Sequence, residues 1–342
     1  MTTRIGKQIH QALLDQKVTK AEIDSLLAEA NANGTVSATE KKELTLLLKA
    51  SGDQFDADAR SALSAFLVPT PPPPAAAETS PVELVELSND PTVLTKHSAS
   101  VSWTAVESGQ LFKDGVSFDD VLQGSIADCF FVGALSAVAH ANPKAIEDCI
   151  KDNADGTYTA RFFSRGPDGQ RKADFVRVDG DIPARWGGGS SAYAKSRDSQ
   201  ELWVTLVEKA YASWKGGYEA LDQGGHPAEV LTAITGSSSS YYLVENHTPS
   251  ELFELIESGV EMGAGMTALT FGEDQKELYQ GTGIHPWHNY TVMGAVRENG
   301  EKYVQLRNPW GCSEPGSDGA DDGIFKMSVY DFAKLYQGLS IN

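Results

Sequence analysis

The sequence predicts an α+β protein of two lobes, preceded by a small all-α module. Residues 1–67 carry only helical patterns, and residues 68–94 form a linker rich in Pro and Ala. The remaining residues mix long helices with strands; helices dominate the first part and alternating strands the last, which is typical of an α+β domain. We expect this domain to span residues 95–342. Its first lobe is expected over residues 95–217 and its second lobe over residues 218–342.

The composition is that of a globular chain with a strong negative charge. The 342 residues are 41% hydrophobic and the formal net charge is −19, which disfavours binding to nucleic acid or to an anionic membrane surface. Three cysteines, an odd and low number for this length, are not the pattern of a disulfide framework. The sequence has no run of about 18 apolar residues. We therefore expect no membrane segment, no Sec-type signal peptide and, by default, a cytoplasmic location.

Two helix starts lie in the N-terminal module. Thr19 with Glu22, and Ser37 with Glu40, have the spacing of a capping box, in which a hydroxyl accepts from a helical amide and a Glu reaches back. Apolar residues at i, i+3 and i+4 follow each start. Both helices are therefore expected to be amphipathic.

The segment 29–40 between these helices has the length of an EF-hand calcium loop. Glu40 falls at its last position, but Asn31 and Asn33 stand where a hard dication prefers carboxylates. We therefore expect an EF-hand-like helical module that is poor in metal. The Pro-rich segment 68–81 can form neither a helix nor a central strand, and it marks a domain boundary.

The elements of the larger region are predicted in chain order. The patterns indicate strands over 156–165 and 172–186, and helices over 129–141 and 199–216. A further helix is expected within 249–259, with Ser250 as its N-cap and Gly259 at its end. Two further strands, within residues 288–311, are joined by a Glu-Asn-Gly turn of the kind that closes a hairpin. Such a hairpin brings the outer ends of its two strands together.

Cys129 begins the predicted helix over 129–141, directly after an Asp. A free Cys is more often a buried, inert residue than a nucleophile, so a chemical role requires partners. Unpaired amides at a helix N-terminus favour a thiolate, which predicts a depressed pKa for this thiol. Gln123 lies in the loop that enters the helix, where its amide, beside the Cys129 N–H, can donate to an oxyanion.

His288 and Asn308 lie at the two ends of the predicted hairpin. Because the turn is short, the Asn308 amide oxygen is expected to accept the His288 Nδ1–H and to leave Nε2 facing a sulfur. Trp310, two residues later, is expected to shield this hydrogen bond from water. With Cys129, these residues form an ordered set suited to nucleophilic catalysis.

The segments around these residues resemble the calpain family of cysteine proteases. "DVLQGSIADCFF" is similar to the family's Q-G-x-x-G-D-C-W segment, and "HNYTVMGAV", "LRNPWG" and "DGIFKMSVYDFAKLY" to its histidine strand, asparagine loop and C-terminal segment. The resemblance covers about residues 100–342 and implies a papain-like two-lobe core. It also implies that Cys129 is the nucleophile and that His288 is first the general base and then the general acid. Asn308 would orient the histidine, and Gln123 would donate a hydrogen bond to the oxyanion.

The resemblance also implies calcium as a regulator, although the chemistry itself needs no cofactor. In the first lobe the ligands would be the carbonyls of Lys113 and Gly115 and the carboxylates of Asp120 and Glu208. The alternative is that these two acids are a surface Asp and a helix Glu paired with nearby cations. In the second lobe Ile324 stands where an acidic ligand is expected, which predicts a weaker site.

Together these features predict a thiol endopeptidase that hydrolyses unstructured segments of protein or peptide substrates. Two alternatives remain: a catalytically idle scaffold that binds proteins, and a thiol acyltransferase, for which an Asp in place of Asn308 would be usual. The protease is preferred because all four chemical positions are present. The N-terminal module is expected to contact the catalytic domain as an accessory or inhibitory element, while Cys149, Cys312 and His285 are expected to be structural.

Overall fold

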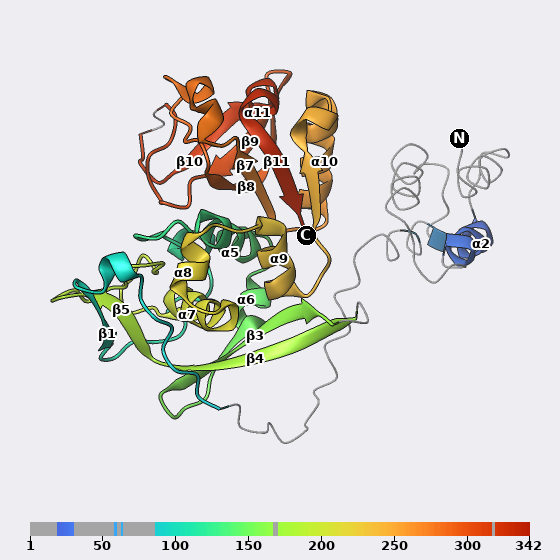
Figure 1. Ribbon diagram of the computed structural model, residues 1–342. Coiled ribbons are helices and arrows are strands. Elements are labelled where there is room, and N and C mark those ends of the chain that lie inside the picture. The colour runs from blue at the N-terminus through green and yellow to red at the C-terminus, as the bar shows by residue number, and fades with distance from the viewer. Residues whose placement is uncertain (1–18, 31–57, 60–62, 64–85, 167–169, 317–318) are drawn as a thin grey trace. The chain divides into compact units, whose positions relative to one another are not determined.

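The chain divides into two units, residues 1–82 and residues 83–342, and each is described by itself. The structure is a computed structural model (Figure 1). It describes the following residues: 19–30, 58–59, 63, 86–166, 170–316 and 319–342. None of the helices in these ranges is long and apolar enough to cross a bilayer.

The longest described element of the first unit is helix α2, Lys20–Ala30; residues 58, 59 and 63 are also helical. It begins directly after Thr19, as the first capping box predicts, and an ion pair of 2.7 Å joins Lys20 to Asp24 one turn later. Ile23 is buried. The second predicted helix, the EF-hand-like loop and the Pro-rich segment lie outside the described residues.

The cysteine lobe of the second unit is built around helix α5, Cys129–Ala141 (Figure 1). Every residue from Phe130 to Ala139 is buried, because the helix is apolar on all faces and is surrounded by neighbours. Helices α6 (Pro143–Cys149) and α9 (Pro227–Thr235) pack on it, and Phe131 packs on Tyr211 of α7 (Trp203–Lys215). Helix α8 (Tyr218–Asp222) packs on α7 in turn. Antiparallel strands cover the lobe: β1 (Val101–Ala105) with β5 (Asp181–Arg185), and β2 (Ile150–Asp152) with β3 (Thr157–Arg165) and β4 (Arg171–Asp179).

The histidine lobe is an antiparallel sheet with the strand order β10-β9-β8-β7-β11-β6. Its strands are β6 (Ser240–Leu243), β7 (Met266–Thr270), β8 (Asn289–Glu298), β9 (Glu301–Arg307), β10 (Ile324–Ser328) and β11 (Tyr336–Ile341). Helices α10 (Pro249–Glu261) and α11 (Val329–Leu335) pack against it. The predicted hairpin is confirmed as β8–β9, and its turn residues Asn299 and Gly300 have φ of +52° and +84°, as a tight hairpin turn requires.

The boundary between the lobes differs from the predicted one at 217/218. The core of the cysteine lobe runs from Leu94 to Ile234, and the core of the histidine lobe begins at Val244. Helix α9 packs on α5 and β3, so α8 and α9 belong to the cysteine lobe. The amphipathic pattern of a short helix does not reveal which of two cores its apolar face enters.

Helix α10 begins two residues earlier than a cap at Ser250 would place it. Thr248 is the N-cap and forms a capping box with Glu251, while Pro249 occupies the first helical position. The helix also continues past Gly259 to Glu261, because Gly259 packs closely against Met266 of β7 and does not end the helix.

Helix α5 packs directly beneath strands β7 and β8 (Figure 1). The Thr291 hydroxyl donates to the Gly133 carbonyl at 2.8 Å, and the Asn289 side-chain amide donates to the Cys129 carbonyl at 3.4 Å. A Cβ at Gly133 would lie 2.6 Å from the Asn289 Nδ2, so only glycine permits this approach. The contact brings the start of β8, with His288 just before it, to the N-terminus of α5.

Candidate active site

A cavity of about 580 Å³ lies between the lobes, and Cys129 and His288 both line it. Cys129 is the first residue of α5 and is partly buried. His288 directly precedes β8 and is 5% exposed. Other lining residues come from both lobes: Gln123, Gly124, Ser125, Asp222, Glu273, His285, Trp287 and Trp310. A ligand in this cavity would therefore touch both lobes.

The environment of the Cys129 sulfur differs from the prediction. Burial raises the pKa of the thiol to about 11, and the negative charge of Asp128 adds to this. The backbone amides of Asn289, Phe130 and Cys129 itself act in the opposite direction and do not offset the burial. The expected depressed pKa is therefore wrong for this structure, because loss of hydration outweighs the amides at the helix N-terminus.

His288 and Asn308 are brought together across the base of the β8–β9 hairpin. The imidazole nitrogen 2.9 Å from the Asn308 Oδ1 is Nε2, and not Nδ1 as predicted. The Asn308 amide is oriented by donation from Nδ2 to the Ser313 carbonyl at 3.3 Å and by acceptance at Oδ1 from the Trp310 N–H at 3.1 Å. Nε2 therefore carries the proton, and Nδ1 is the nitrogen left to exchange a proton in the cavity.

Aromatic rings surround the His288 imidazole. The Trp310 ring lies 4.8 Å and the Tyr290 ring 5.0 Å from it, between ring centres. Burial lowers the pKa of His288 to about 4, although the hydrogen bond that its Nε2–H donates to Asn308 acts to raise it, and the neighbouring His285 lowers it further. His285 packs on Trp310 at 4.4 Å, as expected of a structural residue at the lobe edge.

Thr270, at the end of β7, holds the backbone of His288, and the sequence analysis missed this residue. Its hydroxyl accepts the His288 N–H at 2.9 Å, and its own N–H donates to the His288 carbonyl at 3.0 Å. Its hydroxyl can donate a hydrogen bond to the carbonyl oxygen of His285 or to that of His288. A Thr within an apolar strand carries no local signal of such a role, since the contact is formed between strands distant in sequence.

Gln123 lines the cavity, but its amide is engaged within its own loop. Nε2 donates to the Ile126 carbonyl at 2.9 Å and to the Asp128 Oδ1 at 3.3 Å. Oε1 is buried and has no hydrogen-bond partner. The backbone N–H of Gln123 donates across the lobes to the Pro309 carbonyl at 2.9 Å. The structure thus places Gln123 beside the helix tip without directing its amide at a developing oxyanion.

Two fully buried carboxyl groups, Asp128 and Glu208, face each other behind Cys129. Burial raises the pKa of Asp128 to about 7 and raises that of Glu208 well above its usual value, with Asp128 as the next cause. The Asp128 Oδ2 and the Glu208 Oε2 each lack a partner if both acids are ionised. A single shared proton satisfies both oxygens. The sequence signal for this pair was a Glu in the apolar helix α7.

The predicted calcium ligands Asp120 and Glu208 are not brought together, because Glu208 faces Asp128. The acid beside Asp120 is Glu201, whose pKa is raised by burial and then by the charge of Asp120. Glu201 accepts the Lys113 N–H at 2.9 Å, and Asp120 accepts the Ser117 N–H at 2.8 Å. Glu201 thus replaces Glu208 as the acid that could join Asp120 in a cation site.

The acids of the second-lobe loop are bound to loop amides. Glu314 accepts the Gly323 N–H at 2.5 Å, Asp321 the Ser313 N–H at 2.7 Å, and Asp322 the Ile324 N–H at 2.9 Å. Each of these acids is thus engaged by a loop amide, while the other carboxylate oxygen of Glu314, Oε1, is buried without a hydrogen-bond partner among the described residues.

Another acidic cluster is bridged by a lysine. Oxygen atoms of Asp90, Asp179 and Asp181 lie within 4.8 Å of one another. The buried Lys209 ammonium pairs with Asp90 at 2.7 Å, with Asp179 at 2.5 Å and with Asp181. This cluster is therefore an ion-pair network that fastens the start of the unit to α7.

Comparison with known proteins agrees with this geometry. A family model described as calpain family cysteine protease matches residues 88–320. The rice protein named calpain-type cysteine protease ADL1 (Oryza sativa subsp. japonica) is 32% identical over 263 residues, which cover 68% of this chain and 12% of that protein. Calpain clp-4 of Caenorhabditis elegans is 30% identical, covering 67% and 32%, and mouse calpain-9 is 28% identical, covering 66% and 36%.

The chain thus spans only 12% to 36% of the length of these relatives. The matching region nevertheless includes the cysteine lobe, the histidine lobe as far as residue 320 and every residue that lines the cavity. Because the family model covers well over half of the sequence, this chain belongs to the calpain family of cysteine proteases.

Proposed function

We propose that this chain is a calpain-type cysteine endopeptidase with Cys129 as its nucleophile. The observation that carries the proposal is one cavity lined by Cys129 from the cysteine lobe and His288 from the histidine lobe, with Asn308 2.9 Å behind the imidazole. A binding scaffold has no need of this ordered set. The expected substrates are unstructured protein segments, because a chain must be extended to reach a thiol between two lobes.

The electrostatics imply that the two reacting groups work as a pair. With a thiol pKa of about 11 and an imidazole pKa of about 4, each group alone is neutral near pH 7. Because both groups are buried, a thiolate and an imidazolium form together, since each supplies the counter-charge that the other lacks. The reactivity of Cys129 therefore depends on His288 being in place.

The reaction then follows from the hydrogen bonds. Nδ1 of His288 takes the proton from the Cys129 sulfur, while Asn308 holds Nε2–H and fixes the ring. The thiolate attacks the carbonyl carbon of the scissile bond, and the imidazolium returns its proton to the departing amine. Water, deprotonated by the same Nδ1, next attacks the thioester and releases the acid product.

Oxyanion stabilisation requires one local change at Gln123. The Cys129 N–H at the helix tip supplies one donor. Gln123 supplies the second when its Nε2 leaves the Ile126 carbonyl and turns toward the substrate oxygen, while Asp128 keeps its other N–H. Gln123 lines the cavity beside the tip of α5, which makes it the best-placed candidate.

Calcium is proposed as a regulator and not as a reactant. Asp120 and Glu201 are two neighbouring carboxylates that are largely removed from solvent. Their negative charge and oxygen atoms are what a hard dication such as calcium prefers as ligands. The carbonyls of Lys113 and Gly115 would complete the set. A calcium titration of peptide hydrolysis in wild type and in Glu201→Gln tests this, with Glu208→Gln as the comparison.

The central test is hydrolysis of casein or a fluorogenic peptide by the full chain, with and without calcium. Cys129→Ala is expected to abolish cleavage and Cys149→Ala to preserve it, since Cys149 is buried in the core. Cleavage that persists in Cys129→Ala would overturn the proposal. Transfer of the acyl group to an added amine, without net hydrolysis, would instead favour the acyltransferase.

A further inference from the structure

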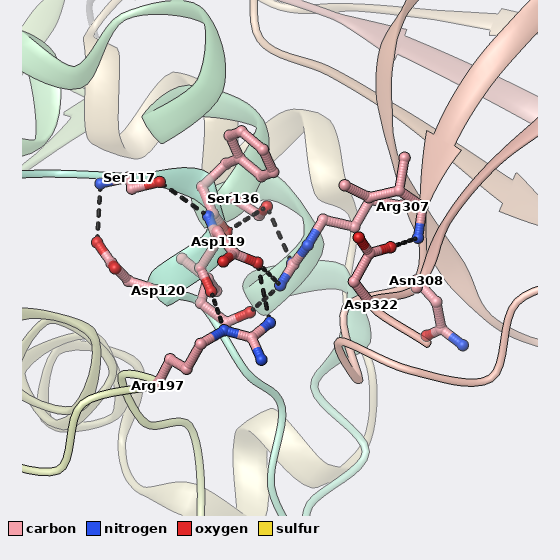
Figure 2. A network of polar contacts seen from close by, with 12 residues as sticks. Ser117, Asp119, Asp120, Ser136, Arg197, Arg307, Asn308 and Asp322 are labelled. Atoms are coloured by element: carbon pink, nitrogen blue, oxygen red, sulfur yellow. Dashed lines mark hydrogen bonds and ion pairs between the residues drawn. The ribbon is translucent and has the colours of Figure 1, made fainter. Parts of the chain in front are cut away.

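Arg307 ends strand β9 directly before Asn308, and its side chain leaves its own lobe. Figure 2 shows the guanidinium reaching into the cysteine lobe, toward the short helix η3, Phe118–Asp120, and the chain that follows it. The residue is 0% exposed although it carries a charge. A buried guanidinium is costly unless its donors are satisfied.

The contacts of this guanidinium all lie in the cysteine lobe. Nη2 donates to the Val121 carbonyl at 2.9 Å, and Nη1 donates to the Ser136 hydroxyl at 3.4 Å. Nη2 also lies 3.8 Å from the half-exposed Asp119 carboxylate, which supplies the counter-charge. Ser136 belongs to α5, about two turns after Cys129. The side chain therefore joins the Asn308 segment both to the helix of the nucleophile and to the loop before it.

The two segments joined in this way run side by side. Beside the Arg307–Val121 contact, the Gln123 N–H donates to the Pro309 carbonyl at 2.9 Å. Gly311 packs so closely on Leu122 that a Cβ would lie 2.3 Å from its side chain. Residues 307–311 of one lobe are thus held against residues 121–123 of the other, with an active-site candidate in each segment.

The energetics argue against a role in stability alone. The Arg307 Nε is buried without a partner, and burial lowers the pKa of the guanidinium to about 10, although the charge of Asp119 opposes this. An apolar side chain would fill this space at lower desolvation cost. A planar fork of donors, in contrast, holds a carbonyl, a hydroxyl and a carboxylate in one fixed geometry, which the freely rotating ammonium of a lysine does not impose.

We propose that Arg307 is a positioning residue that holds Asn308, and through it His288, in register with Cys129 and Gln123 across the two lobes. This inference rests on the proposed cysteine protease activity. The ion pair with Asp119 is shared, because Arg197 also binds that carboxylate at 2.9 Å from the solvent side. Arg197 therefore offers a control: it has the same partner and charge, and although its Nη2 lies 3.5 Å from where a Cβ on Gly311 would stand, its described hydrogen bonds and ion pairs do not reach residues 307–311.

The experiment compares Arg307→Lys, Arg307→Met and Arg197→Met in the full chain, with calcium present. Peptide hydrolysis gives kcat and KM, and alkylation of Cys129 by iodoacetamide at several pH values reports the thiolate–imidazolium pair. For both Arg307 variants we expect kcat to fall by about 100-fold, as a misplacement of about 1 Å does, with KM within about twofold. Alkylation at pH 6 should fall in parallel, and Arg197→Met should match wild type in both measurements.

A second variant guards against loss of folding. Asp119→Asn removes the counter-charge at a half-exposed position without opening a cavity, and we expect kcat to fall by about tenfold. If the Arg307 variants do not fold, the comparison of kcat between Asp119→Asn and Arg197→Met tests the positioning role instead. Equal kcat in those two would overturn the inference.

The inference and the proposed function fail in different ways. Folded Arg307 variants that keep kcat and the pH dependence of alkylation, and lose only melting temperature, would make Arg307 a stability residue and overturn the inference. Wild-type protein that cleaves no peptide and alkylates Cys129 no faster than Cys149 would overturn the proposed function instead.

Discussion

Replacing Asp128 by Asn is predicted to stabilise the catalytic unit at alkaline pH and to leave its stability unchanged in acid. Burial raises the pKa of this carboxyl from 3.8 to about 7, so between these pH values the folded chain keeps a proton that the unfolded chain releases. Because the folded state binds more protons, its stability falls as the pH rises through this window. At about 1.4 kcal/mol per tenfold change in proton affinity, the loss above pH 7 amounts to about 4 kcal/mol.

The Asn side chain preserves the shape of Asp128 and cannot ionise. Its Oδ1 can still accept from Gln123, and its Nδ2 can donate to Glu208, which no longer needs the shared proton. The difference in unfolding free energy between Asp128→Asn and its parent should therefore be near zero at pH 4 and approach about 4 kcal/mol at pH 8. This difference in unfolding free energy is measured by urea unfolding, followed by tryptophan fluorescence. Both proteins carry Cys129→Ala, which prevents autolysis.

Asp222, which neighbours Asp128, provides a control of opposite sign. Partial burial acts to raise its pKa, but an ion pair of 2.6 Å with Lys96 and a hydrogen bond from the Ala127 N–H hold the pKa below its usual value. Asp222→Asn should therefore destabilise at pH 8, and this loss should shrink as the pH falls below the usual pKa of 3.8 and on through the lowered pKa of the folded state. If Asp128→Asn shifts stability equally at both pH values, or destabilises more at pH 8 than at pH 4, the shared-proton account is refuted.

Three further predictions concern the residues around the site. Asn308→Ala should lower kcat by about 100-fold with KM within about twofold, since it frees the imidazole ring to rotate; a change confined to KM would contradict this. Thr270→Val, which keeps the shape but removes the hydroxyl that accepts the His288 N–H, should cost about 1–3 kcal/mol in urea unfolding and lower kcat, whereas unchanged stability would exclude that hydrogen bond as important. Lys209→Met leaves three carboxylates without their cation and should cost about 3–5 kcal/mol at pH 7, less at pH 5, and a loss independent of pH would show that packing dominates.

Local sequence signals predicted much of the fold. Short stretches of sequence are enough to recognise the apolar run that forms α5, the Asn-Gly turn of β8–β9 and the motifs around Cys129, His288 and Asn308. Each depends on periodicity or turn chemistry that the chain carries locally. For this reason the predicted strand ends at His288 and Asn308 do lie together in the structure.

Properties set by tertiary contacts were not predictable in the same way. The pKa of Cys129 depends on how much water the surrounding lobes exclude, which the helix position alone does not reveal. Glu201 lies just before α7, and Glu208 lies on it about two turns later. Only the packing therefore decides which of them faces Asp120 and which faces Asp128. The role of Arg307 likewise required knowing that residues 121–123 run beside residues 307–311.

The most direct measurement is the rate at which a peptidyl vinyl sulfone modifies each cysteine of the full chain, followed by mass spectrometry of proteolytic peptides. If His288 activates a thiol at the tip of α5, Cys129 reacts selectively, and His288→Ala slows that reaction by about 100-fold or more without unfolding the chain. Equal modification of Cys129 and Cys312 in wild type, or a Cys129 rate that is unchanged in His288→Ala, would contradict the account.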